Sequence, residues 1–246
     1  LRLGMPPEGH RYVRVAADPS TWHAPVVVPR AGAPCQEEVI RDVDLRRDLP
    51  HLWFGKEGAS FVTGAVVITR DPETGQRNVG WYRLTSFVDA SHPRGGTYRE
   101  ELAKKFLAGF FWWNPPMNGI GRHIADAVRR GRRLEVACAV MCSPAVHVAG
   151  TTTLPHGVDE LAFAGGLEGR PIELVQCETV DLQVPANAEW VIEGHVVPEQ
   201  QECVGWHSNW IGYYDEANLL PLLEVSCITK RRDAMWYATV EMMPPF

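Results

Sequence analysis

The sequence has no surplus of basic residues and no long apolar run. Its 24 lysines and arginines are outnumbered by 30 aspartates and glutamates, so the formal net charge at pH 7 is -6. A protein whose main partner is a nucleic-acid backbone usually carries a basic surplus, so we expect no nucleic-acid partner. No apolar stretch approaches the roughly 20 residues that cross a bilayer, so we expect no membrane partner.

Cysteine patterning is equally sparse. The six cysteines stand apart, without the paired spacing of a zinc site, and most lie in apolar surroundings. Scattered thiols in a chain of this length indicate a reducing compartment. Because no signal-peptide pattern opens the sequence, we expect a cytoplasmic protein. The sequence also lacks an internal repeat, a low-complexity tract and a nucleotide-binding glycine fingerprint.

What the sequence does contain is the composition of a globular protein, with many predicted strands. Of its 246 residues, 45% are hydrophobic and 22% are charged. Residues 61–69 form a β-branched run typical of a strand buried on both faces. The turn residues Asp71 to Gly75 follow, and residues 78–88 return as a partner strand, which predicts a β-hairpin. Further strands are predicted at 134–141, 146–149, 172–176, 189–197, 222–229 and 235–240, the last two as a pair.

Helices are expected to be few. The proline-rich and charged start of the chain predicts an irregular lead-in with little helix. Residues 98–107 (YREELAKKFL) predict a helix that leads into the aromatic run Phe110 to Trp113, a pattern typical of core or of an interface and, more rarely, of a substrate wall. Residues 121–130 predict a second helix with Ile124 and Ala127 on its apolar face. Many strands with few interspersed helices indicate an α+β fold.

Two carboxylates flank a glycine-rich corner in the stretch from Gly157 to Val197. Glu160 lies on an acidic helical turn, and Glu178 lies at a strand end. Such a pair can bind one metal ion or remain solvated. Spacing alone favours the solvated pair.

Several blocks of the sequence resemble the UbiD family of prenylated-FMN-dependent decarboxylases. They are LEGRPIELVQCETVDLQVPANAEWVIEGHV at 167–196, GYY at 212–214 and TRDPETGQRNVGWYR at 69–83. The resemblance extends from about Ala33 to the C-terminus, and it implies a flavin-reductase-like split β-barrel with flanking helices. It also implies a division of the chain: residues 1–57 as a remnant of the family's N-terminal region, and residues 58–246 as the barrel that binds prenylated FMN. The family's C-terminal dimerisation domain is then absent from this chain.

Asn78 and Arg83 lie five positions apart on one predicted strand, so their side chains point to opposite faces. An arginine on a strand is ordinarily part of a surface ion pair. In the family, the pattern N-x-G-x-x-R supplies an asparagine that binds metal and an arginine that pairs with the substrate carboxylate. Asn78, Gly80 and Arg83 match that pattern. A guanidinium suits this task because its planar fork binds a carboxylate bidentately and stays charged.

The resemblance implies two further metal ligands. His123 follows Arg122 at the start of a predicted helix, where the family places a metal-binding histidine, although a lone histidine is more often structural. Glu160, in the sequence PHGVDEL, matches the family's metal-binding carboxylate. Together with Asn78, these ligands suit Mn²⁺ or Mg²⁺ beside the flavin phosphate rather than a closed zinc site. K⁺ is an additional candidate ion.

The resemblance also implies a set of residues around the cofactor. The predicted cofactor-binding residues are Asn78, Trp81, Tyr82, Arg83, Arg122, His123, Thr151, Thr152 and Glu160. Taken alone, the threonine run at 151–153 is typical of an ordinary strand, because threonine favours strands.

The loop from Glu202 to Tyr214 departs from the family. The family normally reads E-G-P-[FY]-G-[ED]-x-x-G-Y-Y, and Val204 and Asn209 stand at the places of its two acids. Neither side chain donates a proton as a carboxylic acid does. Glu202 lies two positions earlier and is the preferred replacement. His207 is the second, because histidine ordinarily titrates near neutral pH. Asn209 is expected to keep a hydrogen-bonding role toward substrate or flavin.

The resemblance implies a carboxy-lyase that removes CO₂ reversibly from an aromatic, heteroaromatic or α,β-unsaturated carboxylic acid, through a covalent adduct with prenylated FMN. Two alternatives stay open: a non-catalytic cofactor-binding or assembly subunit of a multi-subunit decarboxylase, which the missing acids motivate, and a plain FMN-binding redox protein, which the fold permits. The expected partners are the small carboxylic acid substrate, a flavin prenyltransferase that supplies the cofactor, and a second copy or a partner subunit.

Overall fold

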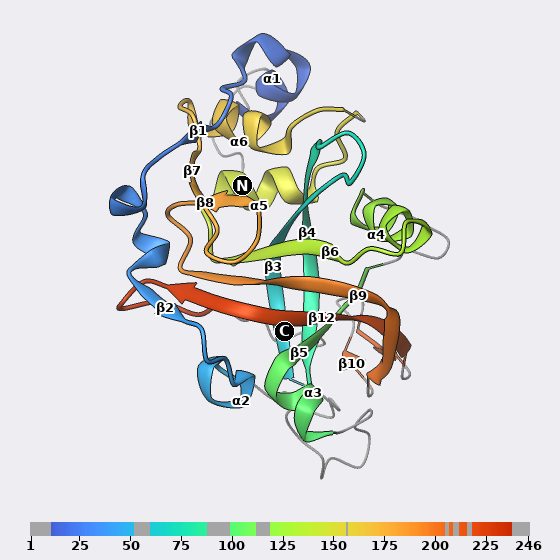
Figure 1. Ribbon diagram of the computed structural model, residues 1–246. Coiled ribbons are helices and arrows are strands. Elements are labelled where there is room, and N and C mark those ends of the chain that lie inside the picture. The colour runs from blue at the N-terminus through green and yellow to red at the C-terminus, as the bar shows by residue number, and fades with distance from the viewer. Residues whose placement is uncertain are drawn as a thin grey trace.

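The fold is a closed β-barrel with helices packed around it (Figure 1). The computed structural model describes residues 11–51, 60–87, 99–111, 119–155, 157–204, 207–208, 212–215 and 218–237. The barrel strands are β3 (Ser60–Arg70), β4 (Arg77–Ser86), β5 (Phe106–Gly109), β6 (Leu134–Val140), β9 (Trp190–Val204) and β12 (Asn218–Lys230). Their order around the barrel is β12-β5-β4-β3-β6-β9, and β9 pairs with β12 to close it. This arrangement confirms the predicted α+β split barrel.

The β3–β4 hairpin forms where the sequence predicts it. Residues 62–69 of β3 are all buried, as expected for a β-branched strand that is covered on both faces. The Asp71 carboxylate organises the connecting turn, because it accepts hydrogen bonds from the backbone N–H groups of Glu73 and Thr74. The predicted strands at 134–141, 172–176 and 189–197 are likewise confirmed, as β6, β7 (Glu173–Gln176) and the first half of β9.

Helix α4 (Gly119–Arg129) confirms the second predicted helix and packs on the barrel core. Its buried side chains Ile120, Ile124 and Ala127 lie at helical spacing and join one hydrophobic cluster with the inward-facing residues of the barrel strands. The helix contacts β3, β4, β6 and β9. These contacts fix the start of α4 beside the β3–β4 hairpin.

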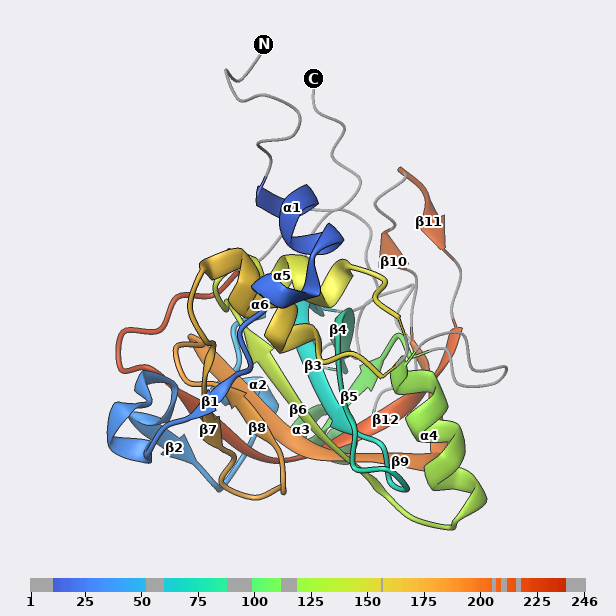
Figure 2. The same cartoon turned by 90° about the horizontal axis from the view of Figure 1, so that it is seen from above.

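Helices α5 (Pro144–Thr151) and α6 (Glu160–Glu168) cover the outer face of β3, β4 and β6 (Figure 2). Phe163 of α6 is fully buried, and its ring packs edge-on against Tyr12 of α1 (Arg11–Ala17) and against Trp22. Beside them lies a small sheet in the order β1-β7-β8, with β1 at Val26–Val27 and β8 at Gln183–Pro185. Across the described ranges, no helix combines the length and the apolar composition that crossing a bilayer requires.

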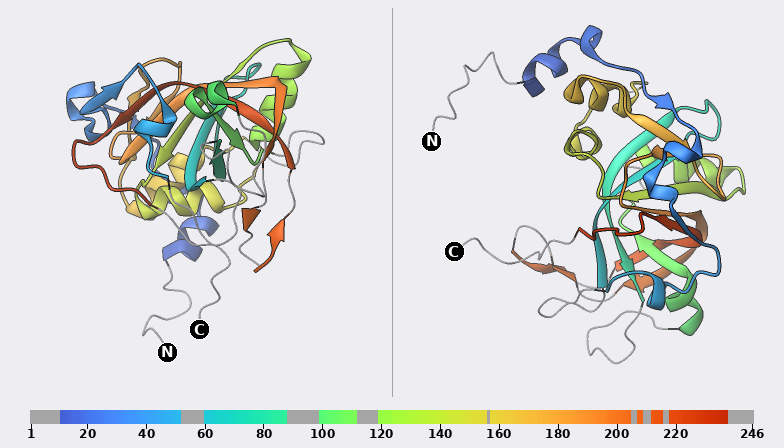
Figure 3. Two further views of the ribbon diagram at one scale, coloured as in Figure 1. Left: turned by 90° about the horizontal axis from the view of Figure 1, so that it is seen from below. Right: turned by 90° about the vertical axis from the view of Figure 1, so that its left-hand side faces the viewer.

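A short ribbon of two strands stands apart from the barrel wall. β10 (His207–Ser208) pairs antiparallel with β11 (Tyr214–Asp215), with His207 opposite Asp215. Figures 2 and 3 show this ribbon on the same side of the barrel as α5 and α6. The outer face of β4 is therefore flanked by helices toward one end and by the ribbon toward the other.

The lead-in is irregular, as predicted, and is tied to the barrel at several points. It contains short 3-10 turns at Pro19–Thr21, Arg30–Gly32 and Pro34–Gln36, the strand β2 (Glu38–Ile40), and the helix α2 (Leu45–Asp48). β2 extends the barrel sheet by pairing with β12. The predicted boundary between residues 57 and 58 stays a prediction, because it lies outside the described residues.

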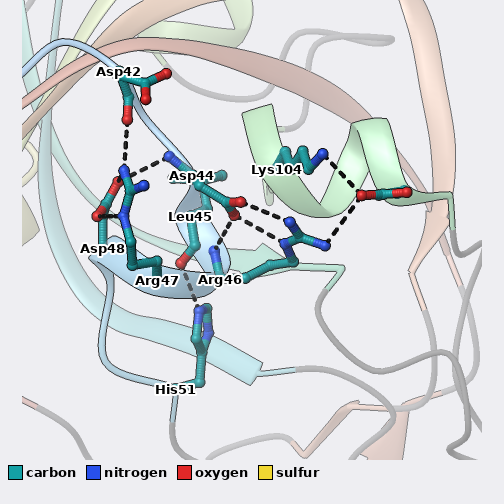
Figure 4. A network of polar contacts seen from close by, with 9 residues as sticks. Asp42, Asp44, Leu45, Arg46, Arg47, Asp48, His51 and Lys104 are labelled. Carbon is teal, nitrogen blue, oxygen red and sulfur yellow. Dashed lines mark hydrogen bonds and ion pairs between the residues drawn. The ribbon is translucent and has the colours of Figure 1, made fainter.

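Helix α2 is joined to helix α3 (Glu100–Lys105) by a network of charged side chains (Figure 4). Two guanidinium nitrogens of Arg46 donate to the Asp44 carboxylate, at 2.9 and 2.6 Å. Arg46 also lies 3.6 Å from the Glu100 carboxylate, which pairs with Lys104 at 2.8 Å. Exposed pairs of this kind contribute little individually, so the network orients the two short helices more than it stabilises them.

Two predictions of local structure were wrong in the middle of the chain. Residues 146–149 belong to helix α5 and not to a strand. Pro144 favours the first turn of a helix, and the buried Val146 and Ala149 lie three positions apart, a spacing that fits a helix. The helix predicted at 98–107 is shorter, because Phe106 begins β5, which pairs with β4 and β12. Trp112 and Trp113 lie outside the described residues.

The predicted pair of strands at the C-terminal end was also wrong in part. The first is confirmed and is longer than expected, because β12 runs through a long antiparallel ladder with β9. Residues 235–237 form no strand, and Trp190 instead donates a hydrogen bond to the Met235 carbonyl. Residues 238–240 lie outside the described residues.

The buried carboxylate of Glu193 on β9 gives a prediction about stability. It accepts the backbone N–H groups of Glu178 and Thr179 and the Thr179 hydroxyl, yet burial raises its pKa above the ordinary value. The folded state then binds a proton that the unfolded state has released, so the free energy of unfolding falls as pH rises above about 4.5. Glu193→Gln is expected to remove this part of the pH dependence.

Urea denaturation between pH 5 and 8 measures the effect as the difference between Glu193→Gln and the wild type. Glu173→Gln is the matched control, because Glu173 lies on nearby β7 and is exposed. If the free energy of unfolding changed with pH in Glu193→Gln as it does in the wild type, the carboxylate would titrate in the folded protein as it does in the unfolded chain.

Candidate functional site

A cavity of about 380 Å³ lies between the β3–β4 hairpin, the start of α4 and the segment that joins α5 to α6. Seven of the residues predicted to bind metal or cofactor line it: Asn78, Tyr82, Arg122, His123, Thr151, Thr152 and Glu160. Both α4 and α6 begin at this cavity, so their positive ends face it. The cavity is therefore suited to an anionic group.

Asn78 is held against the first residue of α4. A Cβ atom at Gly119 would lie 1.6 Å from the Asn78 Oδ1, so only glycine leaves room for this side chain. The Asn78 Nδ2 is buried, and it has no hydrogen-bond partner among the described residues. A buried N–H donor without a partner is costly, so this group calls for an acceptor in the cavity, such as a water or a ligand oxygen.

His123 lies one turn into α4 and is buried. Its Nδ1 is 2.9 Å from the Thr69 hydroxyl, and Thr69 is the cross-strand partner of Asn78. Its Nε2 lies 3.9 Å from an Asp71 carboxylate oxygen. The hairpin therefore holds the imidazole from two sides, as neighbouring groups commonly orient a metal-binding histidine.

Glu160 is the first residue of α6, and Asp159 caps that helix by accepting the Leu161 N–H. The Glu160 Oε2 accepts a hydrogen bond of 3.2 Å from the backbone N–H of Val79, which places this carboxylate beside Asn78. Burial raises the pKa of Glu160 to about 7. A cation in the cavity would offset this desolvation.

The structure thus brings Asn78, His123 and Glu160 into one cavity, although they lie far apart in the sequence. Two oxygens and one nitrogen fit the preferences of Mg²⁺ and Mn²⁺. In the part of the chain that is described, no three His, Cys, Asp or Glu side chains form a metal-binding group. The predicted set relies on an asparagine as its third member, and it stays a prediction.

The other cavity residues form its walls. Burial raises the pKa of Tyr82 to about 12, so this side chain remains a neutral phenol. Thr151 ends α5 rather than a strand, and the hydroxyls of Thr151 and Thr152 both donate to the Val148 carbonyl. Next to them, a Cβ atom added to Gly150 would lie 3.4 Å from the β4 backbone at Gly80 and Trp81. α5 is thereby held close to β4.

Arg83 and Trp81 lie on the opposite face of β4 from Asn78, as their odd spacing predicts. The register of β4 is regular, because the extra residue between Val62 and Ala65 belongs to β3. Neither side chain lines the cavity. Trp81 is 38% exposed on the outer face, where its ring lies against Gly64.

The Arg83 guanidinium is held by aromatic and backbone groups. Its Cζ lies 4.5 Å from the centroid of the Phe110 ring, and its Nη1 donates a 2.5 Å hydrogen bond to the Ser208 carbonyl. The Phe110 ring in turn packs edge-on against His207, with 4.9 Å between the ring centroids. Arg83 and His207 therefore flank one aromatic ring.

The residues predicted to replace the missing acids have different surroundings. Glu202, on β9, is paired with the guanidinium of Arg99. His207, on β10, is buried and lies 3.8 Å from an Asp215 oxygen. Asn209 lies outside the described residues, so its predicted role stays a prediction.

Thr69, Phe110, Gly119 and Asp215 were not predicted from the sequence as part of the site. Phe110 begins an aromatic run that predicted core or an interface and, more rarely, a substrate wall. Gly119 precedes the helix start, where a glycine required for space looks like any other. No local pattern marks Thr69 or Asp215, because each acquires its neighbour through strand pairing.

Comparison with known families identifies the class of protein. The model of the UbiD family, described as the 3-octaprenyl-4-hydroxybenzoate carboxy-lyase Rift-related domain, matches residues 26–244. The match covers most of the chain, so the chain belongs to the UbiD family. This confirms the resemblance seen in the sequence.

Curated relatives of the chain are longer than it is. An uncharacterized protein of Aquifex aeolicus is 39% identical over 224 residues, which are 90% of this chain and 42% of that protein. An uncharacterized protein of Archaeoglobus fulgidus is 35% identical over 218 residues, which are 87% of this chain and 40% of that protein. The chain therefore spans about two fifths of the length of these relatives.

Solved structures of UbiD-class enzymes share the fold. The evolved dimeric form of HmfF from Pelotomaculum thermopropionicum, in complex with prFMN, has a TM-score of 0.80 and 33% identity, and the match covers 94% of this chain and 50% of that chain. Apo 3,4-dihydroxybenzoic acid decarboxylase (AroY) from Klebsiella pneumoniae has a TM-score of 0.75 and 28% identity, and the match covers 91% of this chain and 46% of that chain. The closed form of the vanillic acid decarboxylase ShVdcCD from Sedimentibacter hydroxybenzoicus has a TM-score of 0.80 and 24% identity, with 97% and 49% covered. This last likeness concerns the fold alone.

Proposed function

We propose that the chain is the flavin-binding barrel of a decarboxylase that uses prenylated FMN to remove CO₂ from an aromatic, heteroaromatic or α,β-unsaturated carboxylic acid. One observation carries the proposal: Asn78, His123 and Glu160 share one cavity, while Arg83 lies on the other face of the same strand. The UbiD-class structures with bound prFMN and FMN support a flavin cofactor. When bound, prenylated FMN supplies an electron sink for the pair left behind when CO₂ departs.

The cavity residues would hold the phosphate end of the cofactor. Asn78, His123 and Glu160 would bind Mn²⁺ or Mg²⁺, and the cation would neutralise both the buried carboxylate and the phosphate. The positive ends of α4 and α6 would add attraction for the phosphate. Arg122, Thr151, Thr152 and Tyr82 would contact the flavin from the rim, and the backbone of Trp81 would meet it from β4.

Arg83 would bind and orient the substrate carboxylate. An arginine carries five N–H donors, so one guanidinium can hold the Ser208 carbonyl and also bind an anion. The Phe110 ring under the guanidinium restricts its rotation. Substrate binding at a fixed guanidinium would place the scissile bond in one orientation.

The whole protein is expected to need more than this barrel. The open form of ShVdcCD, which is 25% identical to this chain, was solved with a truncated ShVdcD, and HmfF has an evolved dimeric form. By analogy, we propose that a second copy or a partner subunit completes the site. A flavin prenyltransferase would supply the cofactor.

Release of CO₂ from a panel of aromatic and unsaturated acids tests the proposal. The purified protein, co-produced with a flavin prenyltransferase, is expected to carry prenylated FMN, identified by its mass and absorbance spectrum, and to release CO₂ in proportion to the acid consumed. Bound prenylated FMN without any CO₂ release would favour a non-catalytic subunit. Bound unmodified FMN with reversible reduction would favour a plain redox protein.

Replacement of Gly119 tests the metal-binding role of Asn78 without changing the amide itself. Gly119→Ala is expected to lower the bound Mn²⁺ at least about tenfold, because its Cβ would occupy the place of the Asn78 Oδ1. The metal content is measured by mass spectrometry after dialysis. Gly32→Ala is the matched control, because a Cβ there meets its nearest neighbour at 4.0 Å. Undiminished metal in Gly119→Ala would exclude Asn78 as a ligand.

A further inference from the structure

The feature that the proposed function leaves unexplained is a buried histidine beside the proposed substrate arginine. His207 is 2% exposed, and its ring packs edge-on against Phe110. The same ring lies under the Arg83 guanidinium, which also donates to the carbonyl of Ser208, the next residue along β10. Arg83 and His207 are therefore linked both through one aromatic ring and through the β10 backbone.

A carboxylate lies at the imidazole of His207. Asp215 is directly opposite His207 in the β10–β11 ribbon, and its Oδ2 lies 3.8 Å from the His207 Nε2. The Asp215 side chain is 45% exposed, whereas that of His207 is 3% exposed. Asp215 is therefore open to water, and its carboxylate favours the protonated imidazole. This is the arrangement that a buried proton donor needs, since the donor must be recharged after each turnover.

Glu202, the other candidate, is engaged elsewhere. Its carboxylate pairs with Arg99, and such a pair favours the ionised form, which has no proton to give. It lies on β9, opposite Leu220 of β12. The ion pair with Arg99 therefore makes Glu202 less suited than His207 to donate a proton.

We propose that His207, with Asp215 as its positioning residue, gives the proton that replaces CO₂ on the substrate. The assignment rests on the proposed function, in which Arg83 holds the carboxylate. When the bond between the substrate carbon and the carboxylate breaks, CO₂ leaves and the electron pair stays with the substrate. One N–H bond of the imidazolium then breaks and a C–H bond forms, which leaves His207 neutral. A proton from water, taken up beside Asp215, restores the imidazolium.

Kinetics of His207→Gln test the assignment. Glutamine keeps a polar side chain but holds no transferable proton, so kcat is expected to fall about 10²–10⁴-fold, the usual effect of losing an acid–base group. Flavin content and melting temperature are expected to match those of the wild type. The matched control is His195→Gln, because His195 lies 4.0 Å from the Glu135 carboxylate, on the part of β9 that pairs with β6. That variant is expected to keep full activity.

Binding of benzoate gives a readout that needs no turnover. Measured by calorimetry on the flavin-loaded protein, the Kd is expected to change less than about threefold in His207→Gln and to rise at least about tenfold in Arg83→Ala. A tenfold weaker Kd in His207→Gln would mean that this histidine holds the carboxylate, and it would overturn the proton-donor role.

Asp215→Asn tests the pair while the imidazole stays in place, so it remains informative if His207→Gln does not fold. Two charged groups lie near His207: Asp215, which favours the imidazolium, and Arg83, which contacts the same Phe110 ring and opposes it. In the wild type, kcat is expected to fall at high pH as the imidazolium is lost. Without the Asp215 charge, that fall is expected at lower pH. An unmoved pH profile would overturn the positioning role.

The remaining outcomes separate this assignment from the proposed function. Full activity in His207→Gln, with a collapse in Glu202→Gln, would overturn the assignment alone and transfer the role to Glu202. No CO₂ release by the wild type from any acid, despite bound prenylated FMN, would overturn the proposed function and the assignment with it.

Discussion

Arg83→Ala is expected to lower kcat/KM for CO₂ release about 10²–10³-fold, the scale of losing one partner of a buried charge pair. The reason is that no other described cation lies over the Phe110 ring beside His207 to receive the carboxylate. The bound flavin is expected to stay, because Arg83 does not line the cavity that would hold the flavin phosphate. Steady-state kinetics together with the flavin absorbance measure both effects.

Arg83→Lys separates substrate binding from the structural contact of Arg83. Lysine keeps a positive charge and a donor for the Ser208 carbonyl, but it lacks the planar fork that binds a carboxylate bidentately. Activity is therefore expected to stay low while β10 stays in place. Arg70→Ala is the control, because Arg70, at the end of β3, pairs with the exposed Asp181 in the segment between β7 and β8. Full activity in Arg83→Lys would show that a point charge suffices and that bidentate binding is the wrong role.

Glu160→Gln is expected to lose metal and flavin together, each by at least about tenfold in affinity. A buried carboxylate whose pKa is raised to about 7 gains most from a nearby cation, and a neutral amide offers that cation much less. Metal content and flavin content of the purified variant are measured on the same sample. The barrel is expected to remain folded, because the N-terminus of α6 is capped by Asp159.

Glu168→Gln, at the other end of α6, is the control for Glu160→Gln and is expected to retain both groups. Loss of metal with full retention of flavin would contradict the proposed coupling, since it would show that the flavin phosphate binds without the cation. Loss of flavin with metal retained would instead place Glu160 at the flavin alone.

The parts of the fold that follow from local pattern were predictable from the sequence. The hairpin at 60–86 combines a β-branched run, a turn with Asp71 and a returning strand, and all three signals agree. The stretch VHVA at 146–149 was ambiguous, because a short, mostly apolar segment fits a buried strand and a helix equally. Closure of the barrel through β9 and β12 joins segments whose pairing no local pattern shows.

The site was predictable only through family motifs. Asn78, His123 and Glu160 are ordinary residues at large separations, and nothing in their spacing shows that they share a cavity. Once the motifs are matched, the structure adds what they lack, namely the groups that hold each side chain. Thr69 beside His123 and Phe110 beneath Arg83 are such groups, and both are common residues in unremarkable positions.

Because the register of β4 is regular, the faces to which Asn78 and Arg83 point depend on whether an odd or an even number of positions separates them. Their odd separation sends one side chain toward the cavity and the other toward the ribbon. Loss or gain of a single residue between them would turn the guanidinium of Arg83 to the face where Leu84 is now buried in the core, and a charge there would lack compensation. Under the proposed function, the segment between Asn78 and Arg83 can therefore change its length only in steps of two.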